Sequence, residues 1–316
     1  RMVATDGAGA GAAVTDVLDV LGGTGNVGLG SGAFGTALTT GTDNVAIGEA
    51  AGDALTSGSD NTFVGDNAGG ATTTADNNTA IGSSALLVNS TGAGNTAVGA
   101  FALDANTTAD SNTGIGHTAL TANTSGNTNT AVGSLALSSN TIGDRGVAVG
   151  YNALNAQNPA TNVDMYNIGV GYNAGAAITV GIHNTLVGGN SGDALTEGDQ
   201  NTVLGYRALT TDTLGNKSVA IGDQALENQN FTTATDTYNV GVGAGSGNQV
   251  TTGIFNTIVG GLAGDALTAG TRNVAIGKDA LTTDTLGSRS VAVGFAALYT
   301  QNFTTATDVY NVGVWE

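Results

Sequence analysis

The chain of 316 residues contains 52 glycines, one proline and no cysteine, and its formal net charge is −18 at pH 7. This charge opposes binding to nucleic acid or to an anionic membrane, the lack of cysteine excludes a disulfide framework, and no stretch approaches the about 18 apolar residues of a membrane-spanning helix. The glycines lack the Gly-X-Y period of collagen, and because only 5% of the residues are aromatic, a conventional globular core is excluded as well.

The first 25 residues come before any regular pattern. The opening residues, Arg1 to Ala4, lack the charged and apolar regions of a secretion signal. A stacked array needs its ends covered. We therefore predict that residues 1–25 form an N-terminal cap or connector.

Residues 26–316 repeat a short phrase that ends in glycine, such as the stretch from Asn95 to Gly99. We number each repeat from this closing glycine, which is position 0. Successive closing glycines lie 17 residues apart, with a first step of 18 and a step of 21 once in every 72 residues. A fixed period of this kind is the signature of a solenoid, and we predict one array that continues beyond the given chain. The closing glycines are Gly30, Gly48, Gly65, Gly82, Gly99, Gly116, Gly133, Gly150, Gly171, Gly188, Gly205, Gly222, Gly243, Gly260, Gly277 and Gly294.

Each repeat has the composition of a short strand followed by turns. Position −1 is Val, Ile or Leu and position −3 is Thr, Val or Ile, and such residues favour a pleated strand. Position −2 is apolar or glycine, so both strand faces are expected to be buried. Position +3 is almost always Ala, position +4 is usually Leu or Gly, and turn-forming residues follow. We predict an all-β fold, a repetitive β-solenoid or β-roll of 17-residue rungs, each with two strand-like pieces and two turns.

Position −4 is Asn in most repeats. In stacked rungs these side chains form a ladder in which each amide bonds the next, which is a structural role. One rung cannot bury its own core, so stability must come from its neighbours.

The side chains at position −2 raise the question of what covers the strands. In a lone solenoid one face of every strand is open to water, and we expect the −2 row to be that face. It would expose Phe63, Leu186, Val203 and Ile258 among small residues, and a long exposed apolar stripe marks an interface. Three chains around one axis would bury this row, so we predict a homotrimer. A two-layer solenoid made by a single chain is the alternative.

The phrase Asn-Thr-Ala-Val/Ile-Gly-x-x-Ala-Leu resembles the head repeats of trimeric autotransporter adhesins, and it is even more similar to related repeats in bacteriophage tail fibres. The resemblance extends from Asn26 to Val314. It implies a trimeric, left-handed parallel β-roll and says nothing specific about a ligand. Adhesin heads tend to use shorter repeats, and the regular 21-residue rung is unusual among them. This departure favours a fibre over an adhesin head.

Three segments that recur every 72 residues are four residues longer than the usual connection: Asn155–Tyr166, Glu227–Tyr238 and Tyr299–Tyr310. The extra length does not fit inside a rung whose strands keep their register, so we predict outward bulges. Exposed aromatic residues on loops are typical contact residues for glycans or proteins. The candidate binding residues are Tyr166, Phe231, Tyr238, Tyr299, Phe303 and Tyr310. The alternative is that these rings fold back over a corner of the solenoid.

No residue pattern predicts catalysis. Asp53, Asp193 and Asp265 recur at position +5 as turn residues, and an acid–base pair would not repeat with the architecture. His117 and His183 occupy different repeat positions without close ligand partners, so no metal site is predicted. We predict a non-enzymatic protein with no cofactor. Weak Ca²⁺ sites at loop aspartates are compatible with the sequence, but no spacing demands them.

These patterns favour a structural fibre segment of a virion appendage, such as a phage tail fibre, that projects a distal tip or takes part in host attachment. The expected partners are further copies of the chain and a glycan or protein of the host surface, without nucleic acid or membrane insertion. The expected location is the virion, or otherwise the extracellular surface of a cell. The head of a bacterial trimeric surface adhesin is the alternative. An ice-binding solenoid is a third reading, although its row of threonines at position −3 is interrupted by Val and Ile.

Overall fold

The computed structural model describes residues 24–315, and this part of the chain contains strands and turns but no helix. Accordingly, no helix of the described part is long and apolar enough to cross a membrane. Contacts divide the chain into two compact units, residues 1–144 and 145–316, which we call unit 1 and unit 2. The predicted cap at residues 1–25 lies outside the described residues except for Thr24 and Gly25.

Each rung contributes one three-residue strand at positions −3 to −1, where the β-branched residues predict it. Unit 1 contains β1 (Val27–Leu29), β2 (Val45–Ile47), β3 (Thr62–Val64), β4 (Thr79–Ile81), β5 (Thr96–Val98), β6 (Thr113–Ile115) and β7 (Thr130–Val132). Unit 2 contains β8 (Val147–Val149), β9 (Ile168–Val170), β10 (Thr185–Val187), β11 (Thr202–Leu204), β13 (Val219–Ile221), β15 (Val240–Val242), β16 (Thr257–Val259), β17 (Val274–Ile276), β19 (Val291–Val293) and β21 (Val312–Val314). Unit 2 also has the two-residue strands β12 (Gly215–Asn216), β14 (Thr235–Asp236), β18 (Gly287–Ser288) and β20 (Thr307–Asp308).

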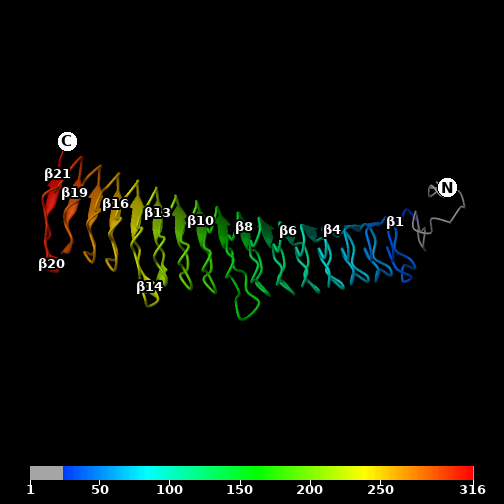
Figure 1. Cartoon of the computed structure of the whole chain (residues 1–316). Helices are drawn as coiled ribbons and strands as arrows, with labels where there is room; N and C mark the ends of the chain where they lie inside the picture. The colour runs from blue at the N-terminus through cyan, green and yellow to red at the C-terminus, as the bar shows by residue number, and fades with distance from the viewer. Residues whose placement is uncertain (1–23, 316) are drawn as a thin grey trace, which may run out of the picture. The chain divides into compact units, whose positions relative to one another are not determined.

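Within each unit, neighbouring strands pair in parallel and in register, so equivalent positions of successive rungs lie side by side (Figure 1). Thr79 is aligned with Thr96 in unit 1. Across a 21-residue rung of unit 2, Val219 is aligned with Val240, so the longer rungs keep the same register. The predicted all-β solenoid of 17-residue rungs with periodic 21-residue rungs is confirmed.

The rest of each rung is a run of tight turns. Backbone φ is positive at positions +2 and +4 in most rungs, as at Phe101 (58°) and Leu103 (52°). An extended strand requires negative φ, so this alternation prevents a strand in the segment just after the closing glycine. The second strand-like piece that we predicted for each rung is, among the described residues, present only in the four rungs that hold β12, β14, β18 and β20.

The closing glycine allows the rungs to stack closely. Gly99 has a φ of 130°, and a Cβ placed on it would lie 2.6 Å from the carbonyl oxygen of Gly116 in the next rung. Residues with a side chain rarely adopt this φ. The carbonyl oxygen of Gly116 cannot move aside to make room for a Cβ, because it is part of the backbone. Position 0 therefore requires glycine for two reasons at once.

The predicted asparagine ladder is present. The backbone N–H and the Nδ2 of Asn61 each donate to Oδ1 of Asn44 at 3.0 Å. The same Nδ2 donates to the backbone oxygen of Ala75 at 2.8 Å. Each buried amide thus joins a rung to the rung before and to the rung after, which satisfies polar groups that stacking removes from water.

The apolar core of each rung lies between position −2 of the strand and positions +3 and +4 of the turn segment. Beside the large Phe63, position +4 is glycine: the ring of Phe63 lies 2.7 Å or less from the Cβ that Gly52 or Gly69 would carry. Where position −2 is Ala97, position +4 is the buried Leu103. In these rungs a large side chain at one position is matched by a small one at the other.

A second inward column, at position +7, differs between the two units. In the last four rungs of unit 1 it holds a ladder of buried amides, in which Nδ2 of Asn106 donates to Oδ1 of Asn89 at 2.9 Å. In unit 2 it repeats a glutamine, two apolar residues and an acid, such as the buried Leu195 and Asp212. The Oδ2 atom of Asp212 accepts from Nε2 of Gln229, which occupies position +7 of the next rung, at 2.6 Å.

The 21-residue rungs bulge outward, as predicted. Residues 160–162 and 232–234 are exposed, and in Figure 1 the loop before β14 and the green loop after β8 extend beyond their neighbouring rungs. The base of the second bulge is held by the parallel pair β12 and β14. Its Phe231 folds back into the molecule with only 7% of its surface exposed.

Candidate functional site

The outward face of the strands is the largest uniform surface of each unit. It is formed by the side chains at positions −3 and −1, which are half-buried or exposed, whereas those at position −2 are buried. Leu29, Ile81 and Leu204 at position −1 are 40–48% exposed. No strand of this set carries a charged residue at either position, although the chain has 25 acidic residues. The face is thus uncharged, with apolar residues at position −1 and Thr, Val or Ile at position −3.

This arrangement corrects the expectation that position −2 would form the exposed row. Phe63, Leu186, Val203 and Ile258 are fully buried inside their own chain. Both strand faces are apolar, so alternation alone does not tell which one the chain covers. The turn segment decides, because its Ala and Leu side chains pack under position −2.

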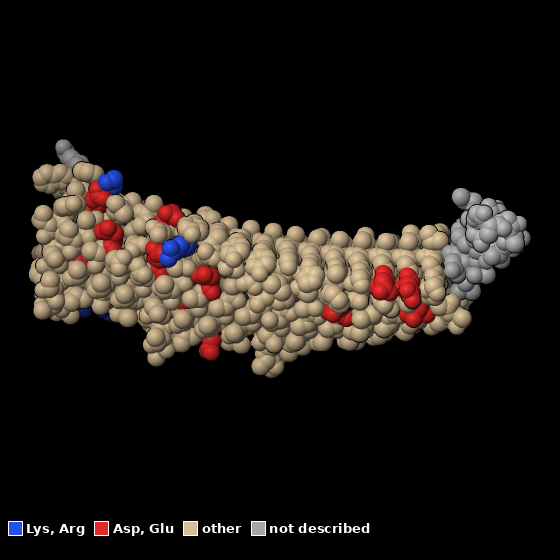
Figure 2. Space-filling view, in the orientation of Figure 1, with Lys and Arg blue, Asp and Glu red and all other residues tan. Residues whose placement is uncertain are grey.

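One column of side chains lies beside this face at position −5, just before each strand. In unit 1 it contains only small or acidic residues: Gly25, Asp43, Asp60, Asn77, Gly94, Ser111 and Thr128. In unit 2 it contains only large ones: Arg145, Tyr166, His183, Gln200, Lys217, Tyr238, Phe255, Arg272, Arg289 and Tyr310. We call these ten residues the N-side column of unit 2. On the side of the molecule shown in Figure 2, Lys and Arg lie over unit 2 only.

The N-side column has an unusual backbone for such residues. All ten have a positive φ between 48° and 64°. Glycine, Asn and Asp tolerate this region, and unit 1 uses mostly such residues there, but for bulky side chains it costs roughly 1–2 kcal/mol each. Unit 2 keeps large side chains at this strained position in every rung, which points to a role for their exposed groups.

Rings and cations of the N-side column stack on one another. Tyr166 is stacked on His183 with ring centroids 5.7 Å apart, and Tyr238 is stacked on Phe255 at the same distance. The guanidinium of Arg272 lies over the ring of Phe255 at 5.2 Å. The rung spacing of a parallel sheet, about 4.8 Å, brings these planar groups into contact.

A cation, an acid and a tyrosine recur together at the long rungs. Lys217 donates to Oη of Tyr238 at 3.2 Å and forms an ion pair with Asp236. Arg145 pairs in the same way with Asp164 and Tyr166, and Arg289 pairs with Asp308 at 3.0 Å and lies over Tyr310. The hydrogen bond with Asp236 raises the pKa of Lys217, and the same bond lowers the pKa of Asp236. These groups brace the start of each strand that follows a bulge.

A second column follows each strand at position +1. In unit 2 it reads Tyr151, Tyr172, Gly189, Tyr206, Asp223, Ala244, Gly261, Lys278 and Phe295. We call these nine residues the C-side column of unit 2. Tyr151 and Tyr172 are stacked with centroids 5.5 Å apart, and the ammonium of Lys278 lies over the ring of Phe295. The four rings of this column are 48–58% exposed.

The structure divides the predicted contact residues. Tyr166, Tyr238 and Tyr310 are exposed on the N-side column, and Tyr299 is exposed elsewhere. Phe231 is buried and Phe303 half-buried, as the alternative prediction of rings folded over a corner requires. The sequence analysis missed the C-side column and the cations, because it considered only the long segments. Aligning all rungs on the closing glycine would have revealed both columns.

Acidic and imidazole groups outside the columns have local partners. Thr210 donates to Asp193, and burial raises the pKa of Asp265, which is hydrogen-bonded to Thr282. The ring of His117 lies edge-on to Phe101. Among the described residues no three His, Cys, Asp or Glu side chains gather in a way that would hold a metal ion.

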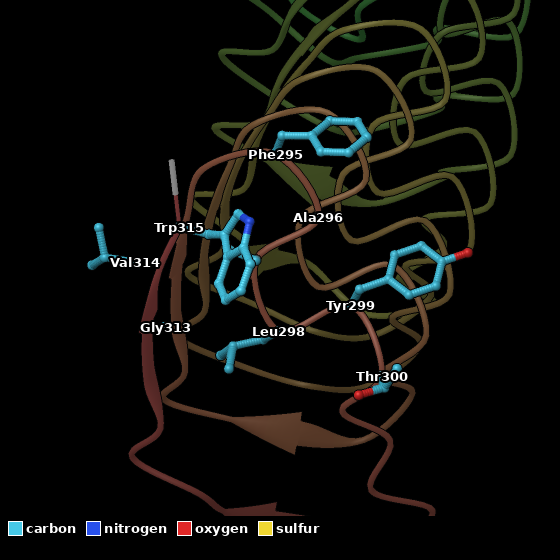
Figure 3. Close-up of a pocket in the computed structure, with 9 residues that line it drawn as sticks. Phe295, Ala296, Leu298, Tyr299, Thr300, Gly313, Val314 and Trp315 are labelled. Carbon is cyan, nitrogen blue, oxygen red and sulfur yellow. The ribbon is translucent and has the colours of Figure 1, made fainter.

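A pocket lies at the last described rung. It is lined by Phe295, Leu298, Tyr299, Val314 and Trp315, among others. Figure 3 shows Leu298 and Trp315 beside each other and Val314 directed away from them. The pocket lies on the face of this rung that no other described rung covers. It is therefore the uncovered face of a stacked rung and not a separate site.

Comparison with protein-family models, with curated proteins and with solved structures found no match. The fold and the surface therefore define the class of the protein: a parallel β-solenoid with an uncharged outward sheet face.

Proposed function

We propose that this chain is a segment of a non-enzymatic homotrimeric fibre, part of a virion appendage similar to a phage tail fibre. Three copies turn their outward sheet faces toward a common axis. The observation that carries the proposal is the outward face itself, which has Val, Ile or Leu at position −1 and no charge in every strand of both units.

The size of the face supports association. Ten strands spaced about 4.8 Å apart and about 10 Å long give the face of unit 2 an area of about 480 Å². Exposed apolar patches of about this size are often functional. The net charge of −18 is carried by other positions, which suits a fibre that is soluble outside and apolar at its axis.

The proposed role is to project a distal tip and to take part in host attachment, with a host-surface glycan or protein as the partner. The exposed bulges of the long rungs and the exposed tyrosine Tyr299 support this role, because they point away from the strands. The proposed location is the virion, outside the host cell.

Sedimentation of the purified chain tests the assembly. We expect a trimer, and a monomer or a face-to-face dimer would contradict the proposal. Neighbouring residues on opposite strand faces provide matched variants: Leu204 is 48% exposed and Val203 is fully buried. Leu204→Asp should give a folded monomer, because it places a charge in the interface. Val203→Asp should instead disrupt its rung, which circular dichroism and urea unfolding would show. Loss of folding in both variants would argue against the outward face as an interface.

A further inference from the structure

We propose that the N-side column of unit 2 in one copy contacts the C-side column of unit 2 in the next copy, rung for rung. These contacts fix the register of the assembly. The inference rests on the proposed trimer and adds to it where the copies meet and which unit holds them together.

The distribution of residue types is the first argument. All seven tyrosines of the chain lie in unit 2, and six of them occupy position −5 or +1. All six Lys and Arg residues of unit 2 occupy position −5, +1 or +2. Tyr and Arg are enriched where proteins meet. They flank the apolar face on both sides, so whatever covers the face also meets the columns.

Geometry places the columns at the corners of a trimer. Packed sheets stand about 10 Å apart, so each face lies about 5 Å from the common axis, and three such faces close a triangle with sides of about 17 Å, or about five extended residues. Positions −4 to 0 span one side. Positions −5 and +1 therefore fall at the corners, where the leading edge of one copy meets the trailing edge of the next. Rotation about a threefold axis keeps equal rungs at equal height, so each −5 residue meets the +1 residue of its own rung number.

Several of the residues that meet in this way are complementary in unit 2, whereas Arg272 meets the like-charged Lys278, whose ammonium already pairs with Asp279 of its own chain. Lys217 faces the carboxylate of Asp223, and the ring of Phe255 faces Gly261, which leaves space for it. Tyr238 similarly faces Ala244. Within one copy these positions are six residues apart, about 20 Å along an extended strand, so they do not touch each other.

The same pairing is unfavourable in unit 1. There, level rungs place Asp43 opposite Glu49 and Asp60 opposite Asp66. No Lys or Arg occurs between residues 24 and 144 to offset these carboxylates. Like charges at the corners repel, so unit 2 is the part that draws the copies together.

The charges favour a second copy over an anionic glycan as the occupant. Arg145, Lys217 and Arg289 already pair with acids of their own chain. A polyanion would have to displace those acids. A second copy has an uncharged face of the same rung spacing, and it brings an oppositely charged residue to Lys217 and small residues to Tyr238 and Phe255.

Cysteine cross-linking tests the contact, because the chain contains no cysteine. We would combine Lys217→Cys with Asp223→Cys and treat the protein with a short bismaleimide. The expected result is a covalent trimer on a denaturing gel. The control combines Lys217→Cys with Phe295→Cys, four rungs or about 19 Å higher, and should remain uncross-linked. If sedimentation shows a trimer and the first pair does not cross-link, the inference is wrong while the trimer stands. If the parent chain is a monomer, the proposed trimer fails first.

Association strength gives a second readout. Replacing Lys217, Tyr238 and Phe255 together with Ser, a small residue found at this position in unit 1, should raise the concentration needed for trimer formation at least tenfold. Replacing Asp43 and Asp60 with Asn in unit 1 should lower it. Equal association of both variants and the parent chain would overturn the assignment of register to unit 2. A loss of host binding in the first variant without a change in association would show that the N-side column binds another ligand. This outcome would also overturn the proposed contact between copies.

Discussion

The two units are built from the same rung and differ in what they place on it. Both have glycine at position 0, an inward −2 row and the asparagine ladder at position −4. They differ at positions −5 and +1, where unit 2 has rings and cations, and at position +7, where most rungs of unit 1 have asparagine and unit 2 repeats a glutamine, two apolar residues and an acid. The stacking of rungs therefore requires particular residue types at some positions, whereas at other positions the residue type varies between the units.

The difference follows from how a solenoid is stabilised. Each rung contacts only its neighbours, so a position that touches the next rung must repeat in every copy. A position that points to solvent is free to vary along the array. The −5 residues are exposed in both units, yet unit 2 keeps them large despite an unfavourable φ. Stacking with the neighbouring rung offsets part of this strain, and the proposed contact with another copy would offset more of it.

The largest effect is expected at a position that the two units share. Gly116→Val in unit 1 and Gly243→Val in unit 2 should each cost more than about 3 kcal/mol, because a Cβ at either glycine would lie 2.6 Å from the backbone of the next rung at a φ above 130°. Urea unfolding would measure both. The losses should be similar, and a tolerated substitution in either unit would show that its rungs can move apart.

The inward +7 column should distinguish the units. Leu195→Ala in unit 2 removes a buried apolar side chain and should cost about 2–5 kcal/mol. Asn106→Ala in unit 1 removes the donor to Asn89 and should cost about 1–3 kcal/mol through the unpaired amide oxygen. Urea unfolding of both variants provides the comparison. A larger loss for Asn106→Ala would mean that the amide ladder, and not apolar packing, dominates the stability of unit 1.

Much of the fold could be predicted from the sequence because each residue preference recurs in every rung, so that it can be recognised above chance. The β-branched residues at positions −3 and −1 locate the strands, and the repeated Asn locates the ladder. The bulges follow from the four extra residues, because pairs such as Val219 and Val240 keep the strands in register across them.

The sequence could not show which strand face is inside. Both faces are apolar, and only the turn segment, with Ala and Leu packed under Phe63 and its equivalents, decides between them. The turn segment itself was predicted as partly strand, because the preference of single residues does not reveal a positive φ at Leu103. The candidate site was recognised in part: Tyr166 and Tyr238 lie on a column whose other members come from rungs of ordinary length.

The buried acid of unit 2 should make its stability depend on pH. Burial raises the pKa of Asp212, so the folded state favours the protonated form. Its contribution to stability is complete at acid pH and is lost as the pH rises through the folded pKa. In unit 1 the equivalent Asn140 accepts from the N–H of Gly143 at 3.0 Å, as Asp212 accepts from Gly215 at 3.1 Å.

Asp212→Asn should therefore lose less stability than the parent chain as the pH rises from acid to alkaline values. Thermal melts across this range would measure it. The matched variant Asn106→Asp should introduce a pH dependence of the same sign into unit 1. Parallel pH profiles of Asp212→Asn and the parent chain would show that the carboxyl does not titrate in this range.

The smallest effect is expected on the surface of the next rung, which is a long one, and it has the opposite sign. The hydrogen bond from Lys217 lowers the pKa of Asp236. A lowered pKa contributes stability that is present above the unfolded pKa and is lost as the pH falls through the folded pKa. Asp236→Asn should therefore melt slightly below the parent chain at neutral pH and together with it at strongly acid pH. Because both groups are exposed, salt screens their attraction, and the difference at neutral pH should shrink when ionic strength is raised. A difference that is large, or that persists in high salt, would show that Asp236 is covered in the assembled protein, since only a shielded pair resists screening.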